Sequence, residues 1–433
     1  MKIFTLISRY WASQPQTLQL RESKRSLLQI HQILQLLWKM DFEILANSTH
    51  TSQNTVEILT RMGVFSKSYL EAGLQTACRM LNTEILEIRL AGLSWIKECL
   101  MFQGHNYPKF SSLTELRSLI VNFHIPQSLF GPACHVELLS RSKDIIQWFA
   151  VFHGSEYLAL MDILWTPVST NQHRSIIKAL IHVLIETQHF LNNHMTLDLL
   201  TKIRSLPASL VDFQILDLLD GITKRCQAFQ QQSHSWPNVL DSIVPIFIDY
   251  FSTETAFEEG VKERSLNVFA SVLEIMDVEA RFQVFSDLVE LVKCHSGSIY
   301  ALKVLVHFID CALTSPDEPI EYKQAIQTFI QTSNLAQVFL EDCQYYQAQA
   351  RIAVSNLPLG TSLNVNDMIL AGTYKHTLQM YWRLYVFRSL TAGAPGLSED
   401  IAFLGSVYDV FVKDGITNSE GDMLFDSLKL VRL

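Results

Sequence analysis

Residues 277–293 read DVEARFQVFSDLVELVK, and this stretch decides the fold class. Its apolar side chains recur at relative positions 0, 4, 7, 11 and 14, namely at Val278, Phe282, Phe285, Val289 and Val292. This spacing follows the period of an α-helix and predicts one apolar helix face. Asp277 precedes the pattern, where its carboxylate can accept hydrogen bonds from the free N–H groups of a first turn. The stretch therefore predicts a helix that begins directly after Asp277.

The flanking sequence continues in the same way. Upstream, helical spacing is found at Leu266, Phe269, Ala270, Leu273 and Met276. Downstream, Ser298 is expected to cap a helix whose inward positions are Leu302, Leu305, Ile309 and Ala312. Earlier in the chain, residues 137–152 predict one amphipathic helix with a face formed by Leu138, Ile145, Phe149 and Phe152.

Helical periodicity recurs along most of the chain. Further segments of this kind span 26–45, 67–81, 84–101, 175–190, 195–205, 209–229, 321–332 and 374–390. Clusters of Pro, Gly and polar residues predict loops at 104–111, 236–238, 315–319 and 357–366. No segment shows a convincing strand pattern. A series of roughly twenty helices with short connections predicts an all-α protein, an armadillo/HEAT-like α-solenoid in which each helix packs mainly on its sequence neighbours.

Composition and charge narrow the choice of partners. Apolar residues make up 48% of the 433 residues, which is ample for a long core, and the formal net charge is −9. Nucleic acid is not an expected partner, because nonspecific affinity for it comes mainly from clustered Lys and Arg. The most apolar stretch, 239–251, is interrupted by Asp241, Ser242 and Asp249 and falls short of the roughly 20 apolar residues that a membrane span needs. No membrane segment is expected, and other proteins remain the expected partners.

The cysteines indicate a reducing compartment. All seven occur singly, without a CxxC pair. Residues 1–11 lack the long apolar core of a signal peptide. The protein is therefore expected in the cytoplasm or the nucleus.

The sequence lacks the common motifs of catalysis and cofactor binding. His-Glu-x-x-His, the two glycine-rich phosphate-binding motifs and the Gly-x-Ser-x-Gly elbow are all missing. Glu186 and His189 form Glu-x-x-His, and His182 shares their helix face, but a di-iron site needs a second copy and two more inward carboxylates. Cys294 and His295 are adjacent, so their side chains would diverge by about 100° on a helix. No metal, cofactor or catalytic residue is predicted.

One set of motifs is more distinctive. Residues 129–139 read LFGPACHVELL, and they are followed by WFA at 148–150, MDILW at 161–165 and His173. Upstream, residues 88–96 read IRLAGLSWI. In this order the motifs resemble the helical-repeat region of the very large, fat-facets-related ubiquitin-specific proteases. That family has Leu-Phe-Gly-Pro, a variable pair, His-x-Glu, a helix ending in Phe-Leu-Ala and a later Ile-Asp-x-Ile-Trp before Lys-His, with Arg-Leu-x-Gly-Leu-x-x-Ile upstream.

The resemblance covers residues 83–225 and shows two departures, at Ala133–Cys134 and at Thr166–Pro167. In the family a thiol-protease domain lies C-terminal to the repeats and carries a Gly-Asn-x-Cys box and a Gly-His-Tyr box. Neither box occurs here, and the nearest strings, around Cys78 and His376, lack the defining neighbours. The resemblance implies that residues 1–235 carry the family-like motifs, that residues 236–433 continue the solenoid, and that this chain contains no catalytic domain. Residues 428–433 are still apolar, so we expect the chain to continue in a longer protein.

The family-like motif also has a physical interpretation that needs no ligand. Leu129 and Phe130 are expected to close a short helix, with Gly131 at positive φ after it and Pro132 preventing its continuation. Three further residues of the motif are polar or aromatic: His135, Glu137 and Trp165. We expect them to fix neighbouring helices against each other, and direct contact with a partner protein is the alternative.

Three functional hypotheses follow. The first is a noncatalytic scaffold region of a large deubiquitinase, which binds ubiquitinated substrates or adaptors while a thiol-protease domain outside this chain cleaves ubiquitin. The second is a free-standing armadillo/HEAT-type adaptor without a protease. The third, ranked last, is a helical enzyme with an unfamiliar site, which would require a deep pocket with converging titratable groups.

Overall fold

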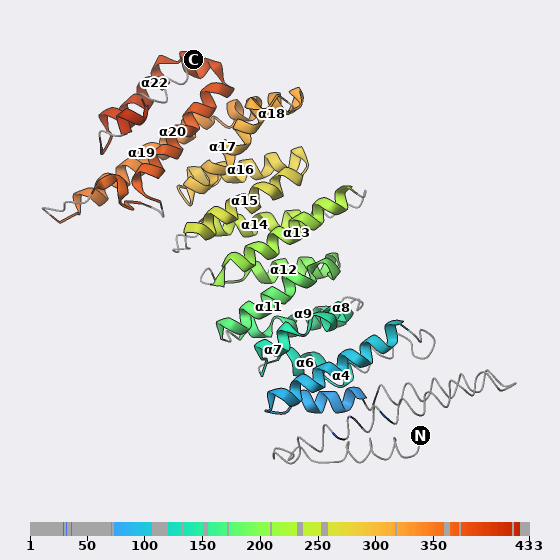
Figure 1. Ribbon diagram of the computed structural model, residues 1–433. Helices are drawn as coiled ribbons and strands as arrows, with labels where there is room; N and C mark the ends of the chain where they lie inside the picture. Colours follow the sequence, from blue (N-terminus) through green and yellow to red (C-terminus); the bar gives the residue numbers. More distant parts are fainter. Residues whose placement is uncertain are drawn as a thin grey trace. The chain divides into compact units, whose positions relative to one another are not determined.

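The computed structural model describes residues 29, 32, 36, 71, 73–105, 120–131, 133–149, 155–170, 173–207, 210–231, 237–252, 259–316, 318–358, 364–371, 374–417 and 420–424. Throughout these residues the regular secondary structure is helical and contains no β-strand, so the predicted all-α class is confirmed (Figure 1). The chain forms two compact units, Met1–Leu199 and Leu200–Leu433. The predicted division after residue 235, which separates the segment that carries the family-like motifs from the rest, stays a prediction.

The first unit contains several short helices and two longer ones, which are α4 and α11. Its described helices are α4 (Leu86–His105), α6 (Ile125–Phe130), α7 (Val136–Ser140), α8 (Lys143–Phe149), α9 (Ser155–Leu164), α10 (Thr166–Ser169), α11 (Arg174–Thr187), the 3₁₀ turn η1 (Gln188–Phe190) and the start of α12 (Asn193–Arg204). Helix α11 packs against α7, α8 and α10, while α4 packs against α7 and α8.

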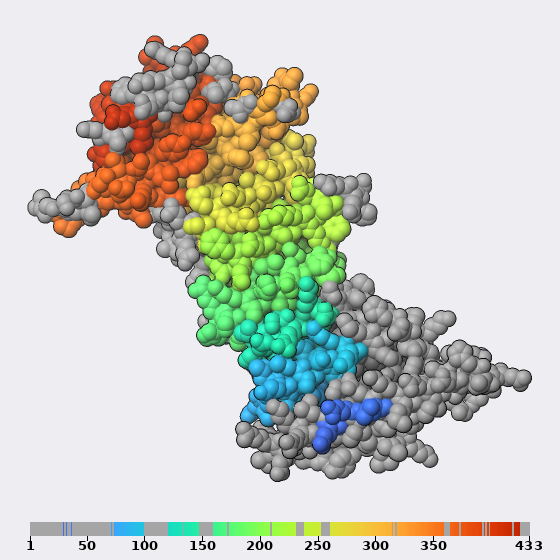
Figure 2. All heavy atoms as spheres, viewed as in Figure 1, coloured from blue at the N-terminus to red at the C-terminus, as the bar shows by residue number. Residues whose placement is uncertain are grey.

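The second unit contains longer helices. Its described elements are α13 (Phe213–Gln231), α14 (Pro237–Ser252), α15 (Glu259–Ile275), α16 (Val278–Lys293), α17 (Ser298–Thr314), α18 (Ile320–Thr332), α19 (Leu335–Ser355), η3 (Val365–Asp367), α20 (His376–Gly393), α21 (Pro395–Glu399), α22 (Ile401–Tyr408) and the π-helical turn η4 (Asp409–Lys413). Figure 2 shows this unit as successive bands of colour, so segments close in sequence are also close in space.

Aromatic side chains link consecutive helices in the core of the second unit. Phe269 of α15 lies with its ring centroid 5.2 Å from Phe247 and 5.5 Å from Phe251, both on α14. Phe251 stacks in turn on Tyr300 of α17 at 5.6 Å. Each such pair contributes about 1 kcal/mol beyond the area that it buries. The same aromatic cluster forms one wall of a cavity that is described below.

Helix α16 begins where the sequence predicted. The Asp277 carboxylate accepts a hydrogen bond from the Ala280 N–H at 2.8 Å, which confirms the N-cap. The predicted face is partly correct, because Phe285, Val289 and Val292 are buried. Val278, however, is 45% exposed, since it lies in the first turn at the edge of the packed surface.

Two expectations about helix boundaries were wrong. Ser298 does not cap α17: Gly297 occupies the N-cap at φ 61°, and Ser298 begins the helix with its side chain turned to Arg383. The single helix expected at 137–152 is divided into α7 and α8. The Ser142 hydroxyl donates to the Leu139 carbonyl at 2.7 Å, and such local side-chain bonds compete with helix continuation.

The segments predicted at 84–101, 175–190, 195–205, 209–229, 321–332 and 374–390 agree with described helices to within a few residues. The described part of the segment predicted at 67–81 is helical, while the start of that segment and most of the loops predicted at 104–111 and 357–366 lie outside the described residues. The loop expected at 315–319 lies between α17 and α18, whereas the one expected at 236–238 is where α14 begins, with Pro237 as its first residue. Most of the segment predicted at 26–45 and all of residues 428–433 lie outside the described residues. In the part of the chain that is described, no helix is long and apolar enough to cross a membrane.

Replacing Asp277 with Ala should lower the free energy of unfolding by about 1 kcal/mol, because the first-turn N–H groups of α16 lose their acceptor. Asp287→Ala is the matched control, since Asp287 is exposed on the same helix away from its ends. That control should change stability by less than about 0.5 kcal/mol. Urea denaturation followed by circular dichroism measures both, and equal losses in the two variants would contradict the capping role of Asp277.

Candidate functional site

The residues of the family-like motif lie in the first unit and act locally. Leu129 and Phe130 are buried and end α6, as expected. The expectation for Gly131 was wrong: its φ is −71°, not positive. A side chain at Gly131 would instead collide with the Gln127 carbonyl oxygen, so glycine is needed for a close approach of the backbone. Pro132 lies outside the described residues.

His135 and Glu137 do not join neighbouring helices through any described contact. The His135 Nδ1 accepts a hydrogen bond from the Glu137 N–H at 3.1 Å and so caps α7. The Glu137 carboxylate pairs with Arg141 of the following turn at 3.2 Å, and both side chains are exposed. Trp165 is buried and precedes α10, which agrees with a packing role. In the described contacts His135 and Glu137 therefore act on the ends of α7, and direct contact of the motif with a partner stays a prediction.

The upstream motif at 88–96 is also explained by packing. Ile88 and Leu93 are buried in α4. Arg89 is buried as well, and its Nε donates to the Leu81 carbonyl at 2.9 Å, where it satisfies the end of the preceding helical segment.

The histidines and cysteines singled out in the sequence do not converge. His182 lies 3.8 Å from Glu186 on the exposed side of α11, and His189 lies beyond the end of that helix in η1, beside Phe190. Among the described residues no group of three potential metal ligands was found. Burial raises the pKa of the Cys134 and Cys226 thiols to about 11, which leaves both protonated at neutral pH.

A polar cavity in the second unit was not foreseen from the sequence. It has a volume of about 360 Å³ and lies between the end of α14, α15, the connection from α16 to α17, α19 and α20. Its floor, as we use the term, consists of five buried polar or charged residues: Lys262, Ser298, Asp342, Gln379 and Arg383. Its mouth consists of four more exposed residues: Ser252, His295, Tyr345 and Gln349.

Arg383 is the centre of the floor. Its Nη2 lies 3.0 Å from the Asp342 carboxylate and donates to the Ser298 hydroxyl at 3.2 Å. Its Nη1 donates to the Gln379 side-chain oxygen at 2.6 Å. The guanidinium also lies over the Tyr346 ring, 4.3 Å from the centroid. One buried cation thus connects α17, α19 and α20.

The connection between α16 and α17 forms the edge of the mouth. His295 and Gly297 both have positive φ, 55° and 61°. Gly297 is required there, because a side chain would also collide with the Phe251 carbonyl oxygen. The His295 ring stacks on Tyr345 at 3.8 Å, and its Nδ1 lies 3.3 Å from the Asp342 carboxylate.

Lys262 is the second cation of the floor. It is 4% exposed, and its ammonium lies 4.4 Å from the centroid of the Tyr300 ring, within the range of a cation–π contact. Burial lowers the pKa of Lys262 to about 8. Lys262 therefore carries a proton at pH 7 and is close to losing it.

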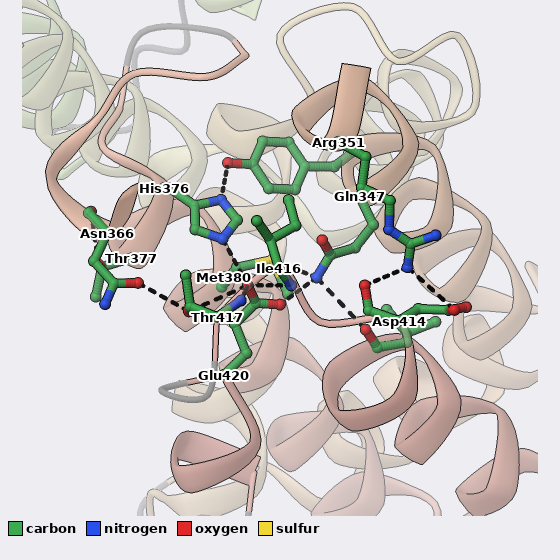
Figure 3. A network of polar contacts seen from close by, with 12 residues as sticks. Gln347, Arg351, Asn366, His376, Thr377, Met380, Asp414, Ile416, Thr417 and Glu420 are labelled. Atoms are coloured by element: carbon green, nitrogen blue, oxygen red, sulfur yellow. Dashed lines mark hydrogen bonds and ion pairs between the residues drawn. The ribbon is translucent and has the colours of Figure 1, made fainter. Parts of the chain in front are cut away.

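A buried network adjoins the floor and holds the C-terminal segment (Figure 3). The His376 Nδ1 is 2.8 Å from the Tyr346 hydroxyl, and its Nε2 is 2.7 Å from the Glu420 carboxylate. That carboxylate also accepts from the N–H groups of Ile416 and Thr417, at 3.0 and 3.1 Å, and from the side chain of Gln347. Tyr346 belongs to both the cavity wall and this network.

The two serine hydroxyls of the cavity lining are turned away from His295. A nucleophile would have to reach His295, but the Ser298 hydroxyl contacts Arg383, and the Ser252 hydroxyl donates to the Asp249 carbonyl. The described part of the lining thus contains no paired nucleophile and base.

One sequence signal could have pointed to this cavity. Arg383 lies at an inward position of α20, between the buried Met380 and Phe387. A charge within an apolar helix face needs a buried partner. The identity of that partner was not accessible, because Asp342 lies on a different helix 41 residues upstream (383 − 342 = 41).

No protein-family model, curated protein or solved structure matches the chain. The resemblance to ubiquitin-specific proteases thus keeps the status of a proposal.

Replacing Glu420 with Ala should loosen the C-terminal segment, because the N–H groups of Ile416 and Thr417 would lose the carboxylate oxygen that accepts from both. We expect backbone amides of residues 409–417 to exchange with deuterium at least about tenfold faster, a loss of about 1.4 kcal/mol of local stability or more. Glu399→Ala, at an exposed position, is the control and should leave exchange of residues 409–417 unchanged. Unaltered exchange in the Glu420 variant would show that the network does not hold this segment.

Proposed function

We propose that the chain is a noncatalytic, protein-binding scaffold built as an armadillo/HEAT-like α-solenoid. The observation that supports this best is the order of helix contacts in the second unit. From α13 to α20, the extensive contacts join helices no more than three positions apart, as in α14 with α17, α16 with α19 and α17 with α20. Packing on sequence neighbours is typical of repeat proteins, whose extended surfaces bind other proteins.

A row of aromatic side chains on α20 supports protein binding. The Tyr381 ring stacks on that of Tyr385 at 6.0 Å, and Trp382 meets Tyr385 edge-on at 5.7 Å. Arg388 lies 5.8 Å from the centre of the Tyr385 ring. Tyr, Trp and Arg are the residues that most often dominate binding energy at protein interfaces. We name this set, Tyr381, Trp382, Tyr385 and Arg388, the α20 ridge.

Within this proposal, the motifs at 88–96 and 129–139 favour a scaffold region of a large ubiquitin-specific protease. The protease domain would lie outside this chain, and the scaffold would bring ubiquitinated substrates or adaptors to it. The alternative is a free-standing adaptor that has inherited the motifs but has no protease domain. The contacts of the motif residues stabilise helix ends, and such contacts would be equally useful in an adaptor and in a protease scaffold.

Tyr381→Ala should remove specific partners from the tagged chain during affinity purification, with recovery falling at least about fivefold by quantitative mass spectrometry. Tyr408→Ala is the matched control, since both tyrosines are 47% exposed, and it should retain those partners. Both variants should keep the melting temperature of the unmodified chain within about 2 °C. Recovery of the same partners by all three proteins would exclude the α20 ridge as the binding surface, and recovery of no specific partner would contradict the scaffold proposal.

The deubiquitinase assignment is tested with a ubiquitin vinyl-sulfone probe and a fluorogenic ubiquitin substrate. The purified 433-residue chain should neither label nor hydrolyse, whereas any longer natural product of the same gene that contains it should do both. Failure of every such product to label would favour the free-standing adaptor. Labelling of a cysteine in this chain alone would disprove the noncatalytic assignment.

A further inference from the structure

The α20 ridge extends onto the neighbouring helix α17. The two helices pack along each other, and α17 also contacts α15. The Tyr385 hydroxyl donates a hydrogen bond to the Asp310 carboxylate of α17, which raises the pKa of Tyr385 to about 12. The Lys303 ammonium of α17 lies 4.8 Å from the centre of the Trp382 ring. The ridge and the outward side of α17 therefore form one continuous surface.

Carboxylates gather beside this surface. Burial raises the pKa of the Cys311 thiol, and the nearby carboxylates of Asp310, Glu274 and Glu318 raise it further. Charges act on one another in this way only over short distances, so the three carboxylates lie close together, although they come from α17, the end of α15 and the connection between α17 and α18. No ion pair of Glu274 or Glu318 is found among the described residues. Both are accessible to solvent, so a cation from another molecule can reach them.

The balance of charge around the surface is negative. Burial and the nearby Asp277 carboxylate raise the pKa of Asp241 on α14, and Asp277 itself lies three residues after Glu274 (277 − 274 = 3). Three cations lie nearby, and each already contacts a carbonyl or a ring of the chain: Arg281, Lys323 and Arg388. Five carboxylates thus face three cations, an excess of two negative charges (5 − 3 = 2).

The surface suits a lysine or arginine side chain in shape as well as in charge. Lys303 shows the arrangement within the chain, because its ammonium lies over the Trp382 ring and pairs with the Glu263 carboxylate. Tyr381 is 47% exposed and stacks on Tyr385, so its ring can receive a cation from outside. The apolar stem of such a side chain would pack on the ridge while its charged end reaches a carboxylate. An acidic partner would be repelled, and an apolar partner would bury carboxylates without pairing them, which costs free energy.

We propose that the α20 ridge, together with Glu274, Asp310 and Glu318, docks a basic segment of another protein, one in which lysine or arginine residues are clustered. The inference rests on the proposed scaffold function and specifies the chemistry of its partner. Carboxylates alone would not define a partner, but here they adjoin an exposed aromatic ridge. Aromatic anchors surrounded by charge of the sign opposite to that of the partner are typical of a protein interface.

Selection of random peptides displayed on phage, with the full chain as the target at pH 7 and about 100 mM NaCl, tests this inference. We expect the enriched peptides to contain clustered lysine or arginine residues. The most enriched peptide is then labelled with fluorescein, and its affinity is measured by fluorescence anisotropy. Glu274→Gln combined with Glu318→Gln should weaken its binding at least about fivefold, because two carboxylates that can pair with its cations are removed. Tyr381→Ala should also weaken it at least about fivefold, because an aromatic anchor is lost.

Glu290→Gln combined with Glu341→Gln is the matched control. Both residues are exposed and lie on α16 and α19, outside the surface described above. This double variant changes the net charge by the same amount and should bind the peptide as the unmodified chain does. Circular dichroism shows whether each variant is folded, and the single substitutions at Glu274 and Glu318 keep the test valid if the double one is not.

Enrichment of neutral or acidic peptides, no enrichment at all, or equal weakening in the two double variants would each overturn the inference. The scaffold proposal fails separately, because it requires partners of any chemistry whose recovery depends on Tyr381. A partner that is lost in Tyr381→Ala but retained by Glu274→Gln with Glu318→Gln would leave the scaffold proposal in place and would contradict the basic segment alone.

Discussion

The buried ion pair between Arg383 and Asp342 is the constraint on which the second unit depends. Both side chains are almost completely excluded from solvent, and a buried charge that loses its partner costs several kcal/mol. Apolar packing tolerates small shifts between helices, whereas the hydrogen bonds that Arg383 donates to the Ser298 and Gln379 side chains depend on distance and direction. Because Arg383 also binds Ser298 and Gln379, the pair determines how α17, α19 and α20 are placed around the cavity.

The same constraint extends to the C-terminal segment through Tyr346. The ring of Tyr346 lies under the Arg383 guanidinium, and its hydroxyl contacts His376, which contacts Glu420. Burial raises the pKa of the Tyr346 hydroxyl, so it stays protonated at neutral pH. An unbroken series of contacts thus runs from the floor of the cavity to the residues that follow η4.

Local features of this fold could be predicted from the sequence, and features that depend on distant residues could not. The start of α16 was predictable because Asp277 and the N–H group that it accepts from are three residues apart (280 − 277 = 3). The cap of α17 was assigned wrongly to Ser298, because the Ser298 hydroxyl accepts a hydrogen bond from Arg383, which lies 85 residues later in the sequence. Gly131 was assigned the wrong backbone conformation, since a tight approach and a positive φ both select glycine. The cavity escaped prediction altogether, because its floor comes from four helices and no two floor residues are neighbours in sequence.

The polar floor is difficult to explain by folding alone. Replacing a buried ion pair with well-packed apolar residues is often neutral or stabilising, so a helical array has no need to bury Lys262, Asp342 and Arg383 together. His295, at the mouth, adds a cost of its own, because a residue other than glycine at positive φ is strained by about 1 kcal/mol or more. Features that reduce stability and occur together are typical of functional sites, where a ligand compensates for them. The concentration of buried charge around one cavity is therefore a feature that the packing of the helices does not by itself require.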